Sequence, residues 1–296
     1  MNLFRYYAKG VSRASSQPKL VFVIWLFNIL FGAFAYFRLN DLFSETIGRS
    51  LVAEKLIKRF EFSFLSELLV HHGDKVGGVF SSLILVALFY FLVSIFLAGG
   101  ILNMIKKVER PFPGEEQHRT FASVFFQGGG KYYGRFFRLL IYSVILWVFF
   151  IGVLIFLYKL GGSLSEKGAK ENVMVVFSLI TPAVAVVLFN GIRMILDYAR
   201  IRIVAEDTNQ VFKTLFQSVG FVFKRLFRTS GLYYSLVLTG LVIFLAYRFL
   251  DGWIPKDAAG LILAGFILGQ VFIFLRGWLK VAFQAGQYSF YLDHRR

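Results

Sequence analysis

Cysteine is absent from this 296-residue chain, and charged residues are scarce, at 17% of the total. The absence of cysteine excludes disulfides, thiol nucleophiles and cysteine-ligated zinc or iron–sulfur centres. Only four histidines are present, and the sequence has no glycine-rich phosphate loop, nucleophile elbow or zinc-protease motif. We therefore expect no metal site and no cofactor, and we expect the protein not to be an enzyme.

Hydrophobic residues make up 57% of the chain and are concentrated in six long runs. Each run approaches the ~20 residues that a helix needs to cross a hydrocarbon core of ~30 Å. Backbone groups inside a bilayer must be paired within the chain, which favours helices. The predicted spans are 20–37, 79–104, 137–158, 173–192, 231–247 and 258–275. None contains Asp or Glu, which argues against a proton-coupled carrier.

The net charge of +16 is unevenly distributed along the chain. If the N-terminus is cytoplasmic, the two tails and the segments 105–138 and 193–230 carry nearly all of the net positive charge. This positive-inside bias predicts that both termini lie in the cytoplasm. A basic surface there would face anionic headgroups. The expected partners are therefore anionic membrane lipids and not nucleic acid.

Two segments separated by 90 residues resemble each other. The first contains Phe126, Gln127, Gly130, Arg135, Phe137 and Arg138, and the second contains Phe216, Gln217, Gly220, Arg225, Phe227 and Arg228. Each precedes a span and has apolar residues at helical spacing, which predicts an amphipathic helix in the cytoplasmic interface. The predicted apolar faces are Phe121, Val124, Phe125, Tyr132 and Phe136 in the first, and Phe212, Phe216, Val219, Phe223 and Leu226 in the second. Phe4, Tyr7 and Val11 provide a weaker copy before the first span.

These features predict an all-α fold in a single membrane domain, 1–296. It would be a bundle of six transmembrane helices built from three two-helix repeats, 1–110, 111–206 and 207–296, each preceded by an interfacial helix. Repeats of two spans share one orientation, so a pseudo-threefold axis would run along the membrane normal. The segment 38–78 is expected to be a long periplasmic helical link that ends in a turn at 71–74.

Polar residues near the ends of the fourth and sixth spans are the candidate site. Charges at membrane depth are costly and are often functional. Arg193, Asp197 and Arg200 lie at i, i+4 and i+7, on one helix face. The candidates for a lipid or ligand headgroup site are Asn190, Arg193, Asp197, Arg200, Arg276 and Lys280, with an ion-paired helix extension as the alternative interpretation. Asn190 and Arg276 occupy equivalent repeat positions and are expected to face each other.

Glycines recur at the ends of the even-numbered spans. Gly99, Gly191 and Gly277 are predicted to allow close helix approach. Pro182 is predicted to kink the fourth span, because proline removes a backbone donor.

Two short stretches of the chain resemble a known group of proteins. They are Leu97-Ala98-Gly99-Gly100, and Asp197-Tyr198-Ala199-Arg200 followed by Ile203-Val204-Ala205-Glu206-Asp207. This group comprises bacterial six-helix inner-membrane proteins, including YciC-type envelope proteins and the membrane domain of some glycerophosphodiester phosphodiesterases. The resemblance implies an inner-membrane location and an envelope or lipid-related role. The phosphodiesterase catalytic domain has no counterpart here.

Two functional hypotheses follow. The first is a non-enzymatic protein that organises lipid or serves as a subunit of an envelope membrane complex. The alternative is the permease subunit of a transporter that relies on a separate ATPase, because an amphipathic helix precedes six spans and no nucleotide-binding motif is present.

Overall fold

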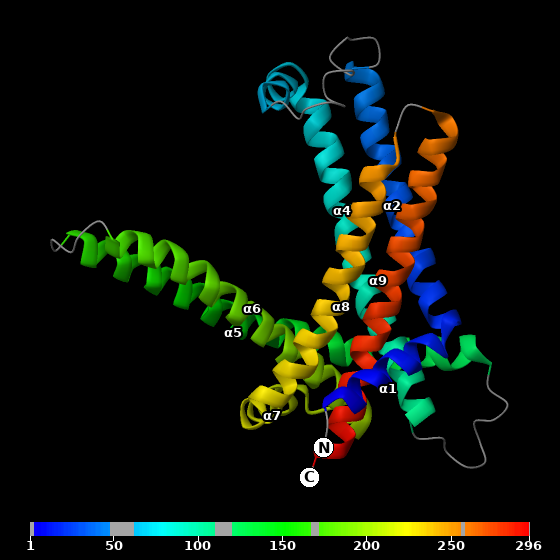
Figure 1. Ribbon diagram of the computed structural model, residues 1–296, viewed down its shortest axis with the longest axis vertical. Helices are drawn as coiled ribbons and strands as arrows, with labels where there is room; N and C mark the ends of the chain where they lie inside the picture. Colours follow the sequence, from blue (N-terminus) through cyan, green and yellow to red (C-terminus); the bar gives the residue numbers. More distant parts are fainter. Residues whose placement is uncertain (1–2, 48–61, 110–119, 167–171, 256–257, 296) are drawn as a thin grey trace. The chain divides into compact units, whose positions relative to one another are not determined.

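The computed structural model describes residues 3–47, 62–109, 120–166, 172–255 and 258–295, and these are almost entirely helical (Figure 1). The helices are α1 (Leu3–Ser15), α2 (Pro18–Ile47), α4 (Phe62–Glu109), α5 (Phe121–Glu166), α6 (Asn172–Glu206), α7 (Val211–Lys224), α8 (Leu226–Trp253) and α9 (Ala259–His294). No strand occurs in these ranges. The all-α prediction is confirmed.

Six of these helices are long and apolar enough to cross a membrane. Their candidate spans are Pro18–Asp41, Val76–Glu109, Phe121–Ser163, Val176–Glu206, Leu226–Trp253 and Ala259–His294. Each overlaps one of the six predicted runs, so the prediction of six spans is confirmed. The chain is an integral membrane protein.

The chain divides into two compact units. Unit 1 contains Met1–Val21 and Ile95–Arg296, and unit 2 contains Phe22–Ser94. In unit 2, α2 packs on α4 through the ring of Phe31, whose centroid lies 5.1 Å from that of Tyr90. The Tyr90 hydroxyl also donates a hydrogen bond of 2.9 Å to Asn28 Oδ1. An interhelical polar contact of this kind is a common means of joining membrane helices.

The predicted turn at 71–74 is wrong, because these four residues lie inside α4. An unbroken helix pairs its own backbone groups, so it can pass through a polar stretch outside the bilayer. The middle of the predicted link, 48–61, lies outside the described residues. Its two ends are helical, since α2 continues to Ile47 and α4 begins at Phe62.

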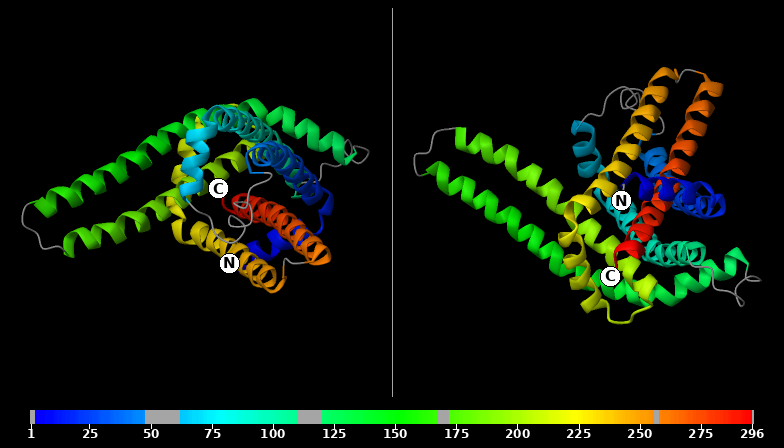
Figure 2. Two further views of the ribbon diagram at one scale, coloured as in Figure 1. Left: turned by 90° about the horizontal axis from the view of Figure 1, so that it is seen from above. Right: turned by 60° about the horizontal axis from the view of Figure 1, so that its bottom comes forward.

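The core of unit 1 lies at the end that carries both chain termini. We call this the terminus end; it comprises α1, α7 and the adjoining parts of α4, α5, α6 and α9. Its largest fully buried side chains include Tyr6, Tyr132, Tyr198, Tyr288, Phe290 and Tyr291. Away from this end, α5 lies along α6 and α8 lies along α9 (Figure 2). There, large apolar side chains are mostly exposed, as expected of surfaces that face lipid.

Helix α1 is docked on the protein by polar contacts at both of its ends. The Tyr6 hydroxyl donates to Asp293 Oδ2 at 3.1 Å, and Arg13 Nε donates to Glu109 Oε1 at 3.2 Å. Burial raises the pKa of Tyr6, and the hydrogen bond to Asp293 adds to this shift. Because Asp293 lies two residues before the last described one and Tyr6 lies near the first, these contacts bring the two termini together.

The predicted interfacial helices differ in form. Both α1 and α7 are separate helices that end before a span, and α7 is separated from α8 by a single residue, Arg225. The segment 121–138, however, forms the first part of one continuous helix, α5. The expected boundary between an interfacial helix and the third span is therefore wrong.

The two similar segments bury matching positions. The buried pairs, 90 residues apart, are Val124 and Thr214, Phe125 and Leu215, Gly128 and Ser218, Tyr132 and Val222, and Leu139 and Thr229. Phe126 and Phe216 are both exposed. The face predicted for the first segment is largely the buried one, whereas Phe212, Phe216, Phe223 and Leu226 of the second predicted face are exposed. The helix α7 thus has two apolar faces. Among the described residues one is buried, and the other is largely exposed, with Phe212 packing against Tyr142 of α5.

Candidate functional site

Asp197 is the centre of the predicted polar cluster on α6. Its Oδ1 atom lies 3.4 Å from Arg200 Nη1, in an ion pair between residues three apart. Arg193 lies one turn earlier on the same helix, and its guanidinium lies 5.7 Å from the centroid of the Phe189 ring. The helical spacing that suggested this cluster therefore places the three residues together.

Lys280 of α9 joins the cluster because α9 packs against α6. The positive charges of Arg200, Arg193 and Lys280 all act on the Asp197 carboxylate. Three cations thus accompany one anion, so the cluster carries a net charge of about +2, counting each group in its ordinary ionised form. The interaction of Lys280 with Asp197 depends on the contact between two helices that lie far apart in the sequence.

Asn190 lies near the cluster, but its partner is not the predicted one. The Tyr233 hydroxyl of α8 donates to Asn190 Oδ1 at 3.4 Å. The charges of Arg193 and Asp197 also act on Tyr233. Sequence reasoning missed Tyr233, since a tyrosine at the start of a span is usual and carries no distinguishing motif.

Arg276 is held differently from the other five candidates. It is exposed, and its guanidinium lies 5.9 Å from the centroid of the Phe272 ring one turn earlier. Within the described ranges, no ion pair joins Arg276 to another residue. The structure therefore brings Asn190, Arg193, Asp197, Arg200 and Lys280 together with Tyr233, but it does not pair Asn190 with Arg276.

The predicted packing glycines differ in their surroundings. A Cβ atom added to Gly99 would lie 3.0 Å from the Gly128 carbonyl oxygen of α5, so α4 and α5 approach closely here. Among the described residues, a Cβ atom on Gly191 would meet no atom within 4 Å, so the predicted close helix approach is not seen there. Gly277 is buried in α9. Pro182 lies inside α6, and the helix continues on both sides of it.

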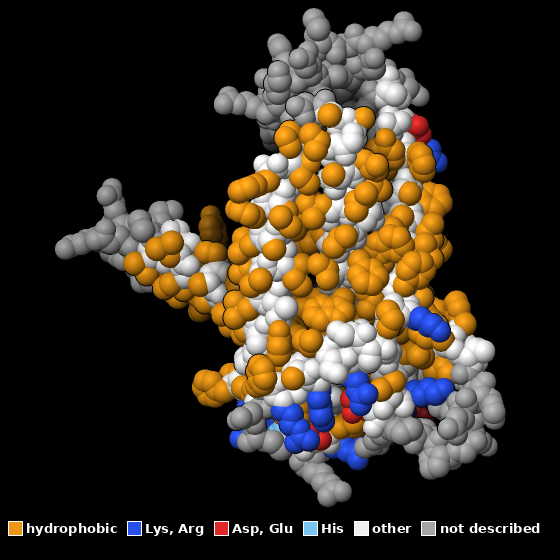
Figure 3. Space-filling model, turned by 45° about the vertical axis from the view of Figure 1, so that its right-hand side comes forward, with side chains coloured by type: hydrophobic (Ala, Val, Ile, Leu, Met, Phe, Trp, Pro, Cys, Tyr) orange, Lys and Arg blue, Asp and Glu red, His pale blue; other side chains and the backbone are white. Residues whose placement is uncertain are grey.

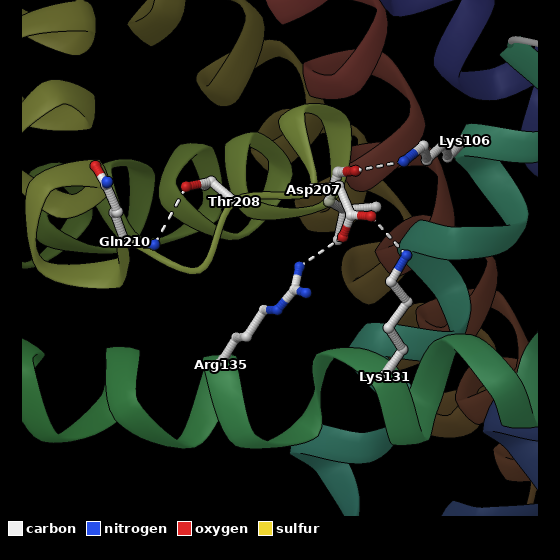
Figure 4. A network of polar contacts seen from close by, with 7 residues as sticks. Lys106, Lys131, Arg135, Asp207, Thr208 and Gln210 are labelled. Carbon is white, nitrogen blue, oxygen red and sulfur yellow. Dashed lines mark hydrogen bonds and ion pairs between the residues drawn. The ribbon is translucent and has the colours of Figure 1, made fainter.

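A second polar cluster lies where α6 ends, at Asp207 (Figure 4). Lys131 Nζ donates to Asp207 Oδ2, and Arg135 Nη1 donates to Asp207 Oδ1, both at 2.6 Å. Lys106 Nζ donates to the carbonyl oxygen of Val204 at 2.8 Å. Asp207 has a positive φ of 52°, the left-handed conformation that often ends a helix. This turn aims the carboxylate at α5.

The Asp207 cluster is a structural clamp that sequence reasoning did not find. Partial burial alone would raise the pKa of Asp207, but its hydrogen bonds to Lys131 and Arg135 outweigh this and hold the pKa below its usual value. Glu206, the preceding residue, accepts hydrogen bonds from Arg202 and from the Tyr291 hydroxyl of α9. The stretch 203–207 therefore joins α6 to α5 and α9. The available signal was a pair of adjacent acidic residues, Glu206 and Asp207, at the end of an apolar helix.

Comparison with known proteins found no family model, no curated protein and no solved structure that matches this chain.

Proposed function

We propose that this membrane protein binds and organises anionic lipids at the cytoplasmic leaflet of a bacterial inner membrane and has no enzymatic activity of its own. The observation that carries the proposal is the largely exposed apolar face of α7. This face presents Phe212, Phe216 and Phe223, each about half exposed or more, beside Lys213 and Lys224. Aromatic and basic side chains together are typical of helices that lie in a membrane interface.

The position of α7 in the chain supports this interpretation. It connects the end of α6 with the start of α8, so it lies where two spans leave the apolar layer. One face is covered by protein through residues that include Val211, Leu215 and Phe221. The opposite face is largely exposed, although Phe212 packs edge-to-face against Tyr142 of α5, with ring centroids 5.3 Å apart. A helix fixed in this way would hold its phenylalanines at headgroup depth.

The charge distribution supports the orientation. Lys and Arg side chains gather at the terminus end in the space-filling view, whereas hydrophobic side chains cover the helices away from it (Figure 3). Anionic lipids of the inner leaflet attract each nearby Lys or Arg by about 1 kcal/mol. Both termini would then be cytoplasmic, with the loop after α8 on the periplasmic side.

The shared burial pattern of the segments around Phe126 and Phe216 supports the proposed repeat. Both phenylalanines are exposed while the matching positions beside them are buried. We propose that hairpins α5–α6 and α8–α9 are related by a pseudo-threefold axis along the membrane normal.

The depth of α7 can be measured directly because the chain has no cysteine. Single nitroxide labels at Phe216→Cys and Phe223→Cys, in vesicles containing phosphatidylglycerol, should be accessible to oxygen and protected from a water-soluble paramagnetic reagent. Lys213→Cys should lie nearer to water. Equal access of the water-soluble reagent to all three labels would contradict the proposal.

The lipid preference requires a second experiment. Lys213→Ala combined with Lys224→Ala should reduce the amount of phosphatidylglycerol that co-purifies with the protein. The matched control is Lys159→Ala with Arg248→Ala. It removes two exposed charges near the ends of α5 and α8 that lie away from the terminus end, and it should leave the amount of bound phosphatidylglycerol unchanged. An equal loss in both variants would mean that total charge, and not α7, determines the lipid content.

Purification from native membranes distinguishes the remaining roles. Co-purification of other membrane proteins would support a subunit of an envelope complex. Co-purification of an ATPase with a nucleotide-binding motif would instead support the permease alternative. One observation favours that alternative: α1 ends at Ser15, only a few residues before α2 begins at Pro18.

A further inference from the structure

The cluster around Asp197 contains more positive charge than its own residues balance. Arg200 is paired with Asp197 at 3.4 Å. Neither Arg193 nor Lys280 has an ion pair in the part of the chain that the structure describes. Both nevertheless interact electrostatically with the Asp197 carboxylate.

Proton transfer within the cluster leaves this excess unchanged. If a proton moves from Lys280 to Asp197, the two groups become neutral and the two arginines still carry two positive charges. Arginine stays protonated in proteins. The cluster therefore keeps a charge of about +2 in either arrangement, and it lies just beyond the apolar run 173–192.

We propose that this cluster binds a phosphomonoester group that carries two negative charges. A guanidinium can donate two parallel hydrogen bonds to phosphate oxygens, and a lysine adds a compact charge. Tyr233 engages Asn190 through Oδ1, which leaves the Asn190 amide nitrogen available as a further donor. A phosphodiester, with one negative charge, would leave one cation of the cluster uncompensated.

The position of the cluster fits the headgroup level of the leaflet at the terminus end. Asp197 lies five residues after the predicted apolar run 173–192 of α6. Lys280 lies five residues after the predicted apolar run 258–275 of α9. The ligand chemistry is a phosphomonoester, and its source is either the headgroup of a lipid such as phosphatidic acid or a soluble phosphate compound. In its lipid form this proposal rests on the proposed lipid-binding function.

The test measures the thermal stability of the full-length protein in detergent with added phosphatidic acid, phosphatidylglycerol, or glycerol 3-phosphate. Phosphatidic acid should raise the melting temperature at concentrations at least tenfold lower than phosphatidylglycerol requires. Glycerol 3-phosphate acting at the same concentration as phosphatidic acid would assign the site to a soluble phosphomonoester. Equal potency of phosphatidic acid and phosphatidylglycerol, with no effect of glycerol 3-phosphate, would overturn the proposal.

Substitutions of single residues test whether the phosphomonoester binds at the Asp197 cluster. Arg193→Gln changes an exposed side chain and should weaken the response to the phosphomonoester at least tenfold, as should Lys280→Gln. Arg276→Gln removes the same charge one turn from Lys280 on α9 and should leave the response unchanged. If all three variants respond alike, the cluster is not the site. The α7 labelling experiment uses different residues, so failure of this site and failure of lipid binding by α7 are distinguishable.

Discussion

Gly10 of α1 lies against Gly286 of α9 with no side chain between the two helices. A Cβ atom added to Gly10 would lie 2.6 Å from the carbonyl oxygen of Ala282 and 3.1 Å from Gly286 Cα. A Cβ atom added to Gly286 would lie 3.2 Å from the carbonyl oxygen of Tyr6. The first and last helices thus touch backbone to backbone, which brings Tyr6 and Asp293 within hydrogen-bonding distance.

We expect Gly10→Ala to destabilise the protein by about 1–3 kcal/mol, the usual cost of overpacking. The added methyl group meets backbone atoms, which cannot rotate away as a flexible side chain can. Thermal unfolding in detergent measures this change. Gly220→Ala in α7 is the control, because its Cβ atom would meet nothing within 4 Å and alanine favours the helix by about 1 kcal/mol. A stable Gly10→Ala variant would contradict the observed contact.

Gly128→Ala and Gly191→Ala should have opposite effects. A Cβ atom on Gly128 would lie 2.3 Å from Asn103 Cβ across the α4–α5 contact, whereas a Cβ atom on Gly191 would meet no atom within 4 Å. The first variant should lower the melting temperature, and the second should leave it unchanged or raise it slightly. Equal losses would indicate that Gly191 packs against another part of the protein.

Asp207→Asn should loosen the attachment of α6 to α5. Asparagine tolerates the positive φ at this position, but it removes the negative charge that Lys131 and Arg135 share. Asp207 is 42% exposed, so we expect a loss of only about 1 kcal/mol. Asp74→Asn, which changes an exposed acid, should have no effect. Melting temperatures at neutral pH test both expectations.

The contribution of Asp207 should depend on pH in a defined direction. Its pKa is lower in the folded protein than its ordinary value, so the unfolded state binds a proton first as the pH falls. The stabilisation is complete above the unfolded pKa of about 3.9 and is lost as the pH falls through the folded pKa. The stability difference between wild type and Asp207→Asn should therefore be constant from pH 6 to 8 and shrink below about pH 4. A constant difference at all pH values would exclude this linkage.

Single cysteines can test the orientation of the spans. Ser163 and Pro255 are exposed near the ends of α5 and α8 that lie away from the core, and Ser12 is exposed on α1. In intact bacterial cells made permeable only at the outer membrane, Ser163→Cys and Pro255→Cys should react with an impermeant maleimide. Ser12→Cys should react only after the inner membrane is opened. The reverse pattern would place the termini in the periplasm.

The candidate site was predictable only in its local part. Arg193, Asp197 and Arg200 share a face because the helical repeat brings residues three and four apart together, and this needs no tertiary information. Lys280 was grouped with these residues only through the expected repeat, and its position beside Asp197 depends on the packing of α9 against α6. Arg276 looked equivalent by its position in the repeat, yet it lies over Phe272, because rotation of a helix about its axis determines which residue faces a neighbour.

The sequence by itself determined the six spans and the all-α class. A membrane helix satisfies its own backbone hydrogen bonds, so local composition and length are sufficient to define it. Only the tertiary structure decided that Asp207 meets Lys131 and Arg135, that Tyr233 meets Asn190, and that the core lies at the terminus end. These contacts join segments far apart in the chain, and they depend on where the helices cross. Small residues such as Gly10 and Gly286 set those crossings by letting two backbones touch.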